Sequence, residues 1–252
     1  MGQSLLLALR ETPEFRLSGA IASTKSGRLG QDAAGEGAPT GVLITSDVGL
    51  GIQGAAVAVD FSSSAAVAAH TEACTAARIP ILIGVTGVDD ASRAVVERAA
   101  RAIPVLMAPN TSVGVAVVAQ LVSMAASRLG PAYDVEIFEA HHRMKRDAPS
   151  GTALALGEAV AQARAVSLNE VATYDRAGQN APRVPGSIGF SSLRAGDIVG
   201  EHTVSFAAAG ERVEITHRAT DRITFARGAL RAAEWLLGRP AGLYGMQNVL
   251  GL

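Results

Sequence analysis

Hydrophobic and polar positions follow two different periods along the first half of the chain. Short runs rich in β-branched residues, typical of buried strands, alternate with longer segments in which apolar residues recur at helical spacing. Strands are predicted at residues 15–23, 42–45, 55–61, 80–84 and 104–107, and helices at residues 3–10, 64–77, 89–102 and 113–128. Strands that alternate with helices predict an α/β domain built on a doubly wound parallel sheet.

The pattern changes in the second half. Strands predicted at residues 135–138, 187–193, 201–208 and 211–216 surround one helix, residues 152–165, which indicates an α+β domain with a mixed or antiparallel sheet. The last predicted helix, residues 223–237, can return to the first domain. We therefore expect one domain of residues 1–111 and 223–252 and a second domain of residues 112–222.

Composition narrows the class of function. The net charge of −1 and the pI near 6.5 give no basic surface for nucleic acid or anionic membranes. The most apolar run, residues 113–126, is interrupted by Gln120 and Ser123, so neither a membrane span nor a secretion signal is expected. The single cysteine, Cys74, excludes an internal disulfide and is expected to be buried and inert. These features predict a cytoplasmic protein that acts on small molecules.

The central stretch of the chain, residues 135–153, brings two histidines, a lysine and a helix start together. Its β-branched beginning predicts a strand that carries His141 and His142 at its end. Ser150 is a candidate N-cap for the helix that follows. Free backbone N–H groups at this helix start are expected to bind an anion, most simply a carboxylate. They belong to Ser150, Gly151 and Thr152.

Lysine is rare in this chain and therefore informative. Only Lys25 and Lys145 are lysines among 22 basic residues. Arginine cannot lose a proton near neutral pH, so a lysine retained close to His141 indicates proton transfer. His141 and Lys145 can then serve one pocket as proton donors and acceptors, with a satisfied structural histidine as the alternative.

The other histidines give no sign of a metal site. Adjacent histidines on one strand point to opposite faces, so His141 and His142 cannot hold one ion unless the strand has ended. His70, His202 and His217 stand alone in the sequence and are interpreted as structural or incidental. No metal site is predicted.

Ligands of parallel α/β sheets bind beyond the carboxyl ends of the strands. The residues that follow four of the predicted strands are small, polar or glycine, as a cofactor cleft requires, although any strand-to-helix turn uses such residues. They are residues 22–23, 60–62, 84–87 and 108–111.

One long motif carries a resemblance to a known family. Residues 139–153, Glu-Ala-His-His-Arg-Met-Lys-Arg-Asp-Ala-Pro-Ser-Gly-Thr-Ala, resemble the signature of the 4-hydroxy-tetrahydrodipicolinate reductases, the dihydrodipicolinate reductases of bacterial lysine and diaminopimelate synthesis. The resemblance covers nearly the whole chain, and the central motif is long and specific. Further segments match in the same order, at residues 60–62, 84–87, 109–114, 183–190, 194–202 and 214–217.

The resemblance implies a Rossmann-like cofactor domain and an NAD(P)H-dependent reduction, with loss of water, of a cyclic imine-containing dicarboxylate. It implies that His141 donates and accepts a proton and that Lys145 is a second proton donor. It also implies that His142 and the backbone of Gly151 and Thr152 bind the substrate, and that a homotetramer assembles through the sheet of the second domain.

The cofactor contacts implied by the resemblance lie in three turns. Where the family often has an acidic residue followed by arginine, this sequence has Ala22 and Ser23, and with Lys25 nearby this favours NADPH over NADH. Thr111 stands where the family usually has an aromatic residue. The implied cofactor-binding residues are Ser23, Lys25, Gly84, Val85, Thr86, Ala108, Pro109, Asn110 and Thr111.

The chain departs from the family pattern at its start. The family opens with a strand and a Gly-x-x-Gly-x-Met-Gly loop, whereas this sequence starts at Met1-Gly2, which correspond to the end of that loop. We expect Met1 to be an internal methionine of a longer protein whose first strand is central in the sheet. Two alternatives stay open: a truncated, non-catalytic chain that oligomerises but binds cofactor poorly, and another amino-acid-pathway dehydrogenase on the same scaffold.

Overall fold

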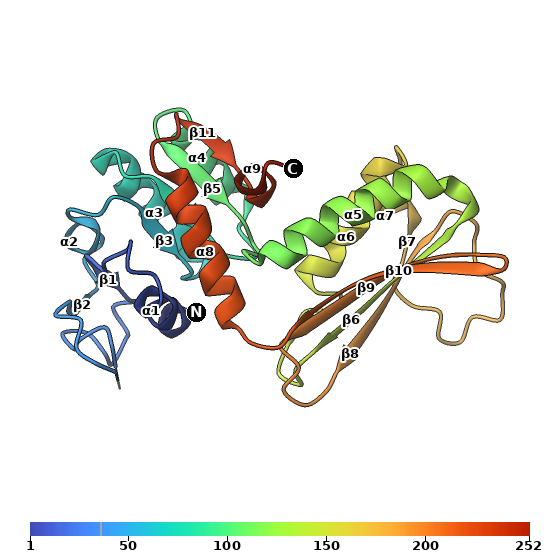
Figure 1. The fold of residues 1–252 in the computed structure, drawn as a ribbon, viewed down its shortest axis with the longest axis horizontal. Coiled ribbons are helices and arrows are strands. Elements are labelled where there is room, and N and C mark those ends of the chain that lie inside the picture. Colours follow the sequence, from blue (N-terminus) through green and yellow to red (C-terminus); the bar gives the residue numbers. More distant parts are fainter. Residues whose placement is uncertain (36) are drawn as a thin grey trace. The chain divides into compact units, whose positions relative to one another are not determined.

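The chain folds into two units in this computed structural model, which describes residues 1–35 and 37–252. Unit 1 comprises residues 1–113 and 222–252, and unit 2 comprises residues 114–221 (Figure 1). The last part of the chain therefore returns to the unit in which the chain begins.

A parallel sheet of four strands forms the centre of unit 1. Its order is β11 (Gly242–Tyr244), β5 (Pro104–Met107), β4 (Ile81–Ile83) and β3 (Ala58–Asp60). All three pairings are parallel, which confirms the doubly wound α/β prediction. Strand β11 was not predicted, because its three residues are too few to show a period.

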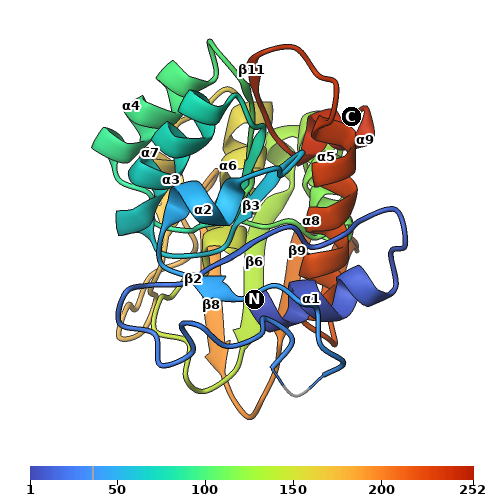
Figure 2. The same cartoon turned by 90° about the vertical axis from the view of Figure 1, so that its left-hand side faces the viewer.

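Helices cover both faces of this sheet. α3 (Ser64–Ala77) and α4 (Asp90–Ala99) lie on one face, and α8 (Ile223–Leu236) and α1 (Gly2–Arg10) lie on the other (Figure 2). Cys74 is buried inside α3, where burial raises the pKa of its thiol to about 12 and keeps it inert, as predicted. Two short helices, α2 (Val48–Ile52) and α9 (Met246–Leu250), complete the unit.

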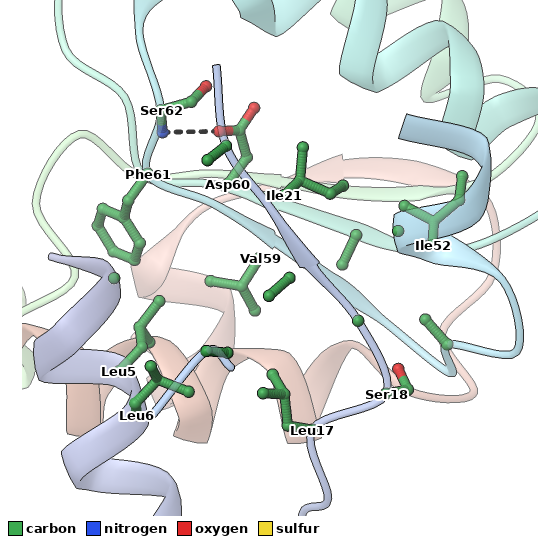
Figure 3. A pocket seen from close by; sticks show the side chains of 18 of the residues that line it. Leu5, Leu6, Leu17, Ser18, Ile21, Ile52, Val59, Asp60, Phe61 and Ser62 are labelled. Carbon is green, nitrogen blue, oxygen red and sulfur yellow. Dashed lines mark hydrogen bonds between the residues drawn. The ribbon is translucent and has the colours of Figure 1, made fainter. Parts of the chain in front are cut away.

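The first predicted strand is much shorter than expected. Of residues 15–23 only β1 (Ala20–Ile21) is a strand, and it pairs with β2 (Ile44–Thr45) in a separate two-stranded sheet. A cavity of about 470 Å³ lies between β1 and β3 and is lined mainly by apolar side chains (Figure 3).

The glycine-rich loop before β2 is organised by one carboxylate. Asp32 accepts hydrogen bonds from the backbone N–H groups of Ala34, Thr40 and Gly41. The bonds from Ala34 and Thr40 contribute most to lowering the pKa of Asp32 to about 2.

Unit 2 is a mixed sheet with helices on one face. The strand order is β10 (Glu211–Ala219), β9 (Gly200–Ala208), β6 (Asp134–His141), β8 (Ile188–Arg194) and β7 (Ala172–Thr173). β6 is parallel to β8 and antiparallel to β9, which confirms a mixed sheet. α5 (Val113–Leu129), a 3₁₀ turn (Gly130–Ala132), α6 (Gly151–Ala163) and α7 (Leu168–Val171) complete the unit.

The hydropathy of α5 exceeds what we expected. With its 3₁₀ extension, residues Val113–Ala132, it is long and apolar enough to cross a membrane by length and composition, so the expectation that no run reaches this length was wrong. One face, with Val118 and Val122, packs into the core of unit 2. The opposite face carries exposed Leu121 and Met124, which raises the mean hydropathy without implying a membrane.

Candidate active site

Strand β6 presents four side chains in alternation to the helix-covered face of the unit 2 sheet. Val135 and Ile137 enter the hydrophobic core, and Glu139 and His141 follow on the same face. The side chain of Glu139 is 1% exposed and that of His141 is 11% exposed. The strand includes His141 and ends before His142, so the two histidines need not point in opposite directions.

The carboxylate of Glu139 is the centre of a hydrogen-bond network. Arg194 on β8 donates from both terminal nitrogens, over 2.7 and 2.8 Å. His141 Nδ1 lies 2.6 Å from Oε2, and the backbone N–H of Ser150 donates to Oε1 over 3.1 Å. Burial alone would raise the pKa of Glu139, but these bonds, with one from Ser192, lower it to about 2. Glu139 is therefore ionised near neutral pH.

His141 is neutral near neutral pH in this environment. Burial lowers its pKa, and the positive charges of Lys145 and Arg194 lower it further, while Glu139 acts in the opposite direction. Because Glu139 is ionised, the proton of the neutral ring belongs on Nδ1, and Nε2 carries the lone pair. The ring can then accept a proton at Nε2 and return it.

His202 on β9 belongs to the same cluster, contrary to the interpretation that it stands alone. It is buried, its ring packs edge-on against His141 at 5.2 Å between centroids, and its Nε2 lies 2.9 Å from the Ser150 hydroxyl. Burial lowers the pKa of His202 to about 4, so it is neutral. The alternation of β9, with His202 between buried Gly200 and Val204, is the sequence signal that places it inside.

The helix start after the loop is capped as predicted. Ser150 is the N-cap of α6, and its hydroxyl accepts a hydrogen bond from the N–H of Ala153. The expectation of a free N–H at Ser150 was wrong, because this group already donates to the internal carboxylate of Glu139. Gly151 is exposed, and no atom lies within 4 Å of where its Cβ would be, so a ligand has room to approach.

Lys145 and His142 lie in the loop between β6 and α6. Lys145 Nζ forms an ion pair with Asp147 over 2.9 Å, and its charge acts on His141. The backbone N–H of Lys145 donates to the carbonyl of His142, which closes a turn. His142 and Thr152 are partly buried. The structure thus places all the predicted catalytic and substrate-binding residues in unit 2.

The predicted cofactor residues lie in turns of unit 1. Gly84, Val85 and Thr86 follow β4, and the turn from Ala108 to Thr111 follows β5. β4 and β5 are parallel neighbours, so both turns are at the carboxyl edge of the sheet.

Two of these positions have a structural role. A Cβ on Gly84 would come within 2.3 Å of the Phe61 ring, so glycine is required there by packing. Thr111 is 1% exposed, and its hydroxyl donates to the carbonyl of Phe225, so its side chain serves the fold.

Ser23 and Lys25 follow β1 and are exposed. The Ser23 hydroxyl accepts a hydrogen bond from the backbone N–H of Lys25. Within residues 1–35 and 37–252, no carboxylate lies at ion-pair distance from the Lys25 ammonium group.

The large cavity of unit 1 is distinct from the predicted cofactor residues, none of which lines it. Asp60 and Ser62 lie at one end of it (Figure 3). His70, which we interpreted as standing alone, pairs with Asp60 over 2.9 Å, and this bond raises the pKa of His70. Among the described residues, no group of three or more His, Cys, Asp or Glu is placed to hold a metal ion.

Comparison with known proteins gives consistent matches over the whole chain. The family model described as "Dihydrodipicolinate reductase, N-terminus" matches residues 1–111, and that described as "Dihydrodipicolinate reductase, C-terminus" matches residues 114–250. The chain is 49% identical over 254 residues to a 4-hydroxy-tetrahydrodipicolinate reductase of Anaeromyxobacter dehalogenans, covering 100% of this chain and 94% of the relative. It is 49% identical over 253 residues to that of Thiobacillus denitrificans, covering 100% and 95%.

A solved structure shares the fold. It is described as dipicolinate-bound dihydrodipicolinate reductase from Paenisporosarcina sp. TG-14, and it matches with a TM-score of 0.74 at 23% identity. The match covers 98% of this chain and 94% of that one.

Proposed function

Because the chain belongs to the dihydrodipicolinate reductase family, we infer that it is an NAD(P)H-dependent oxidoreductase that reduces 4-hydroxy-tetrahydrodipicolinate to tetrahydrodipicolinate in lysine and diaminopimelate biosynthesis. The matched relatives carry this name rather than that of another dehydrogenase. This chain covers 94% and 95% of their length.

The observation that supports this function most directly is the position of His141 at the end of β6, in the same unit as Lys145 and the first turn of α6. A dicarboxylate needs donors for its oxygens. We assign this role to His142 and to the backbone of Gly151 and Thr152. A helix N-terminus favours a carboxylate, because the first N–H groups point outwards and the helix dipole is positive there.

Reduction with loss of water needs a protein group that moves protons. His141 supplies this exchange at Nε2, and Lys145 supplies a second proton. In the structure the ammonium group of Lys145 forms an ion pair with Asp147 over 2.9 Å. Binding of a substrate carboxylate then competes with Asp147 for the same cation.

The turns after β4 and β5 fit a dinucleotide, because they lie together at the carboxyl edge of a parallel sheet and include exposed Thr86 and Pro109. When bound, NAD(P)H supplies the hydride. We propose that Ser23 and Lys25 hold the adenosine end. Lys25 favours the 2′-phosphate of NADPH, since no acidic side chain stands at Ala22 or Ser23 to repel it.

We further propose that the protein is cytoplasmic and forms a homotetramer through the uncovered face of the unit 2 sheet. Phe138 on β6 and Leu193 on β8 project from that face and are 45% and 41% exposed. Their polar surroundings include Thr203, which hydrogen-bonds Thr216 over 3.0 Å. An apolar centre within a polar rim is the usual make-up of a protein interface.

The direct test has two measurements. Calorimetry with NADPH and NADH asks whether this 252-residue chain binds the cofactor. Oxidation of NADPH in the presence of freshly generated 4-hydroxy-tetrahydrodipicolinate asks whether it turns over, with His141→Gln as the variant expected to lose turnover. Cofactor binding without any reduction of this substrate by the wild-type chain would overturn the proposal.

A further inference from the structure

We propose that Glu139, held by Arg194, is a positioning residue: it fixes the proton of His141 on Nδ1 and so presents Nε2 as the atom that exchanges protons with the substrate. This inference rests on the proposed function and extends it to two residues that carry no assigned role. It identifies the source of the ring orientation and of the tautomer on which proton exchange depends.

The contact between Glu139 and His141 determines the tautomer. Oε2 lies 2.6 Å from Nδ1, a distance that requires a proton between the two atoms. Because the carboxylate is ionised, that proton resides on the ring nitrogen. The neutral imidazole therefore cannot carry its proton on Nε2 while this contact persists.

Arg194 keeps the carboxylate ionised and in place. A buried carboxylate without a partner would take up a proton and lose its ability to accept the Nδ1–H bond. The two parallel bonds from Arg194 prevent this and fix the plane of the carboxylate. Arg194 also donates to the carbonyl of Asp147, so one guanidinium holds both Glu139 and the loop that carries Lys145.

The opposite edge of the ring is kept open by a glycine. A Cβ on Gly200 would lie 3.1 Å from His141 Nε2, closer than ordinary contact. Gly200 has no positive φ, so glycine at this position serves the space beside the ring and not the backbone conformation. The ring is thus hydrogen-bonded at Nδ1 and has a glycine beside Nε2, an arrangement that suits a proton-exchanging histidine.

The groups around His141 set the direction of its titration. Glu139 on the same strand raises its pKa, whereas Lys145 in the loop and Arg194 on β8 lower it. His202 on β9 packs against the ring and is neutral, so it adds no charge near pH 7. Glu139 is the one negatively charged group among these, and it raises the pKa of His141. Its removal should therefore lower that pKa further.

The first experiment is the pH profile of turnover in Glu139→Gln. We expect kcat to fall on the order of 100-fold, the lower end of the contribution of a general acid or base. The limb of the pH profile that reports the ionisation of His141 should move to lower pH, while the Kd of NADPH stays within twofold. The matched control is Glu136→Gln, since Glu136 lies on the same strand and pairs with Arg176 and Arg183 away from His141. Its profile should equal that of the wild type.

The second experiment observes the ring directly. With nitrogen-15 histidine, the chain gives five imidazole signals, and His141→Gln identifies that of His141. We expect the Nδ1–H tautomer in the wild type, and a mixture of tautomers with a lower pKa in Glu139→Gln. This readout needs no turnover, so it tests the positioning role even if the substrate is a different one.

A folding defect is separated from a positioning defect by the double variant Glu139→Gln/Arg194→Gln, which removes both charges and leaves none stranded. Because Glu139 raises and Arg194 lowers the pKa of His141, the double variant is judged by the tautomer and not by the position of the limb. If it melts like the wild type and shows mixed tautomers, the proposal stands, and an unchanged Nδ1–H tautomer in either variant overturns it, whatever happens to kcat.

Discussion

Gly228 in α8 is a position where a single methyl group should strongly destabilise unit 1. A Cβ there would lie 1.9 Å from the carbonyl oxygen of Thr111, about 1.5 Å short of the 3.4 Å at which ordinary contact begins. The oxygen belongs to the backbone, and the position of the Cβ is fixed by the backbone of α8, so neither atom can rotate away. In an unobstructed helix, replacement of glycine by alanine stabilises by about 1 kcal/mol. Overpacking costs about 1–3 kcal/mol or more, and the collision should dominate.

We expect Gly228→Ala to lower the free energy of unfolding of unit 1 by about 2 kcal/mol, or to lower Tm by roughly 4–8 °C for a unit of this size. Trp235, the single tryptophan, lies in the same helix, so its fluorescence in a urea titration reports unit 1. NADPH affinity should also fall, because the turn at Thr111 must shift.

The control for this substitution is Gly2→Ala at the start of α1, where no atom lies within 4 Å of the added Cβ. It should change the free energy of unfolding by no more than about 0.5 kcal/mol. If Gly228→Ala proves as stable as the wild type, or more stable, the close approach of α8 to the Thr111 turn is not as described here, and the reasoning fails.

Three further predictions concern charges. Lys145→Ala should lower kcat by on the order of 100-fold while leaving the Kd of NADPH within twofold, because its proton is needed mainly in the transition state; equal kcat values would exclude Lys145 from the mechanism. Lys25→Ala should raise the Kd of NADPH about fivefold at low salt and leave that of NADH unchanged, and a parallel change for both cofactors would refute the 2′-phosphate contact. The pKa of Glu139 is lowered from 4.5 to about 2, so its contribution to stability is present above pH 4.5 and is lost as the pH falls towards 2. Urea titrations over this pH range give the free energies of unfolding of the wild type and Glu139→Gln. The difference between them should shrink by up to about 3 kcal/mol as the pH falls, and a constant difference would contradict the assignment.

Local pattern was sufficient to predict several elements of the fold. The helix at residues 64–77 and the strand at residues 104–107 were predicted to the residue, because each has a clear period and clear boundaries. Residues 15–23 were predicted as one strand but form only two strand residues, since β2 is the one strand bonded to them in the described chain. A strand needs a partner, and sequence pattern does not show whether the partner exists.

The candidate site was predicted only in part. His141, Lys145 and the Ser150 cap could be identified from one continuous stretch of sequence. Arg194 and His202 could not, because they meet Glu139 through the register of β8 and β9, more than 50 residues away in the chain. Register depends on the pairing of whole strands, which no local window contains.

The cavity between β1 and β3 has a consequence for the response of the protein to hydrostatic pressure. Unfolding is accompanied by a loss of volume that grows with the internal void space eliminated, so pressure favours the unfolded state of the unit that contains more void. The cavity of about 470 Å³ in unit 1 is partly open to solvent and is lined largely by side chains such as Leu6, Leu17 and Val59 that hold water weakly. Compression should therefore destabilise unit 1 by an amount that grows with the part of this cavity that stays dry.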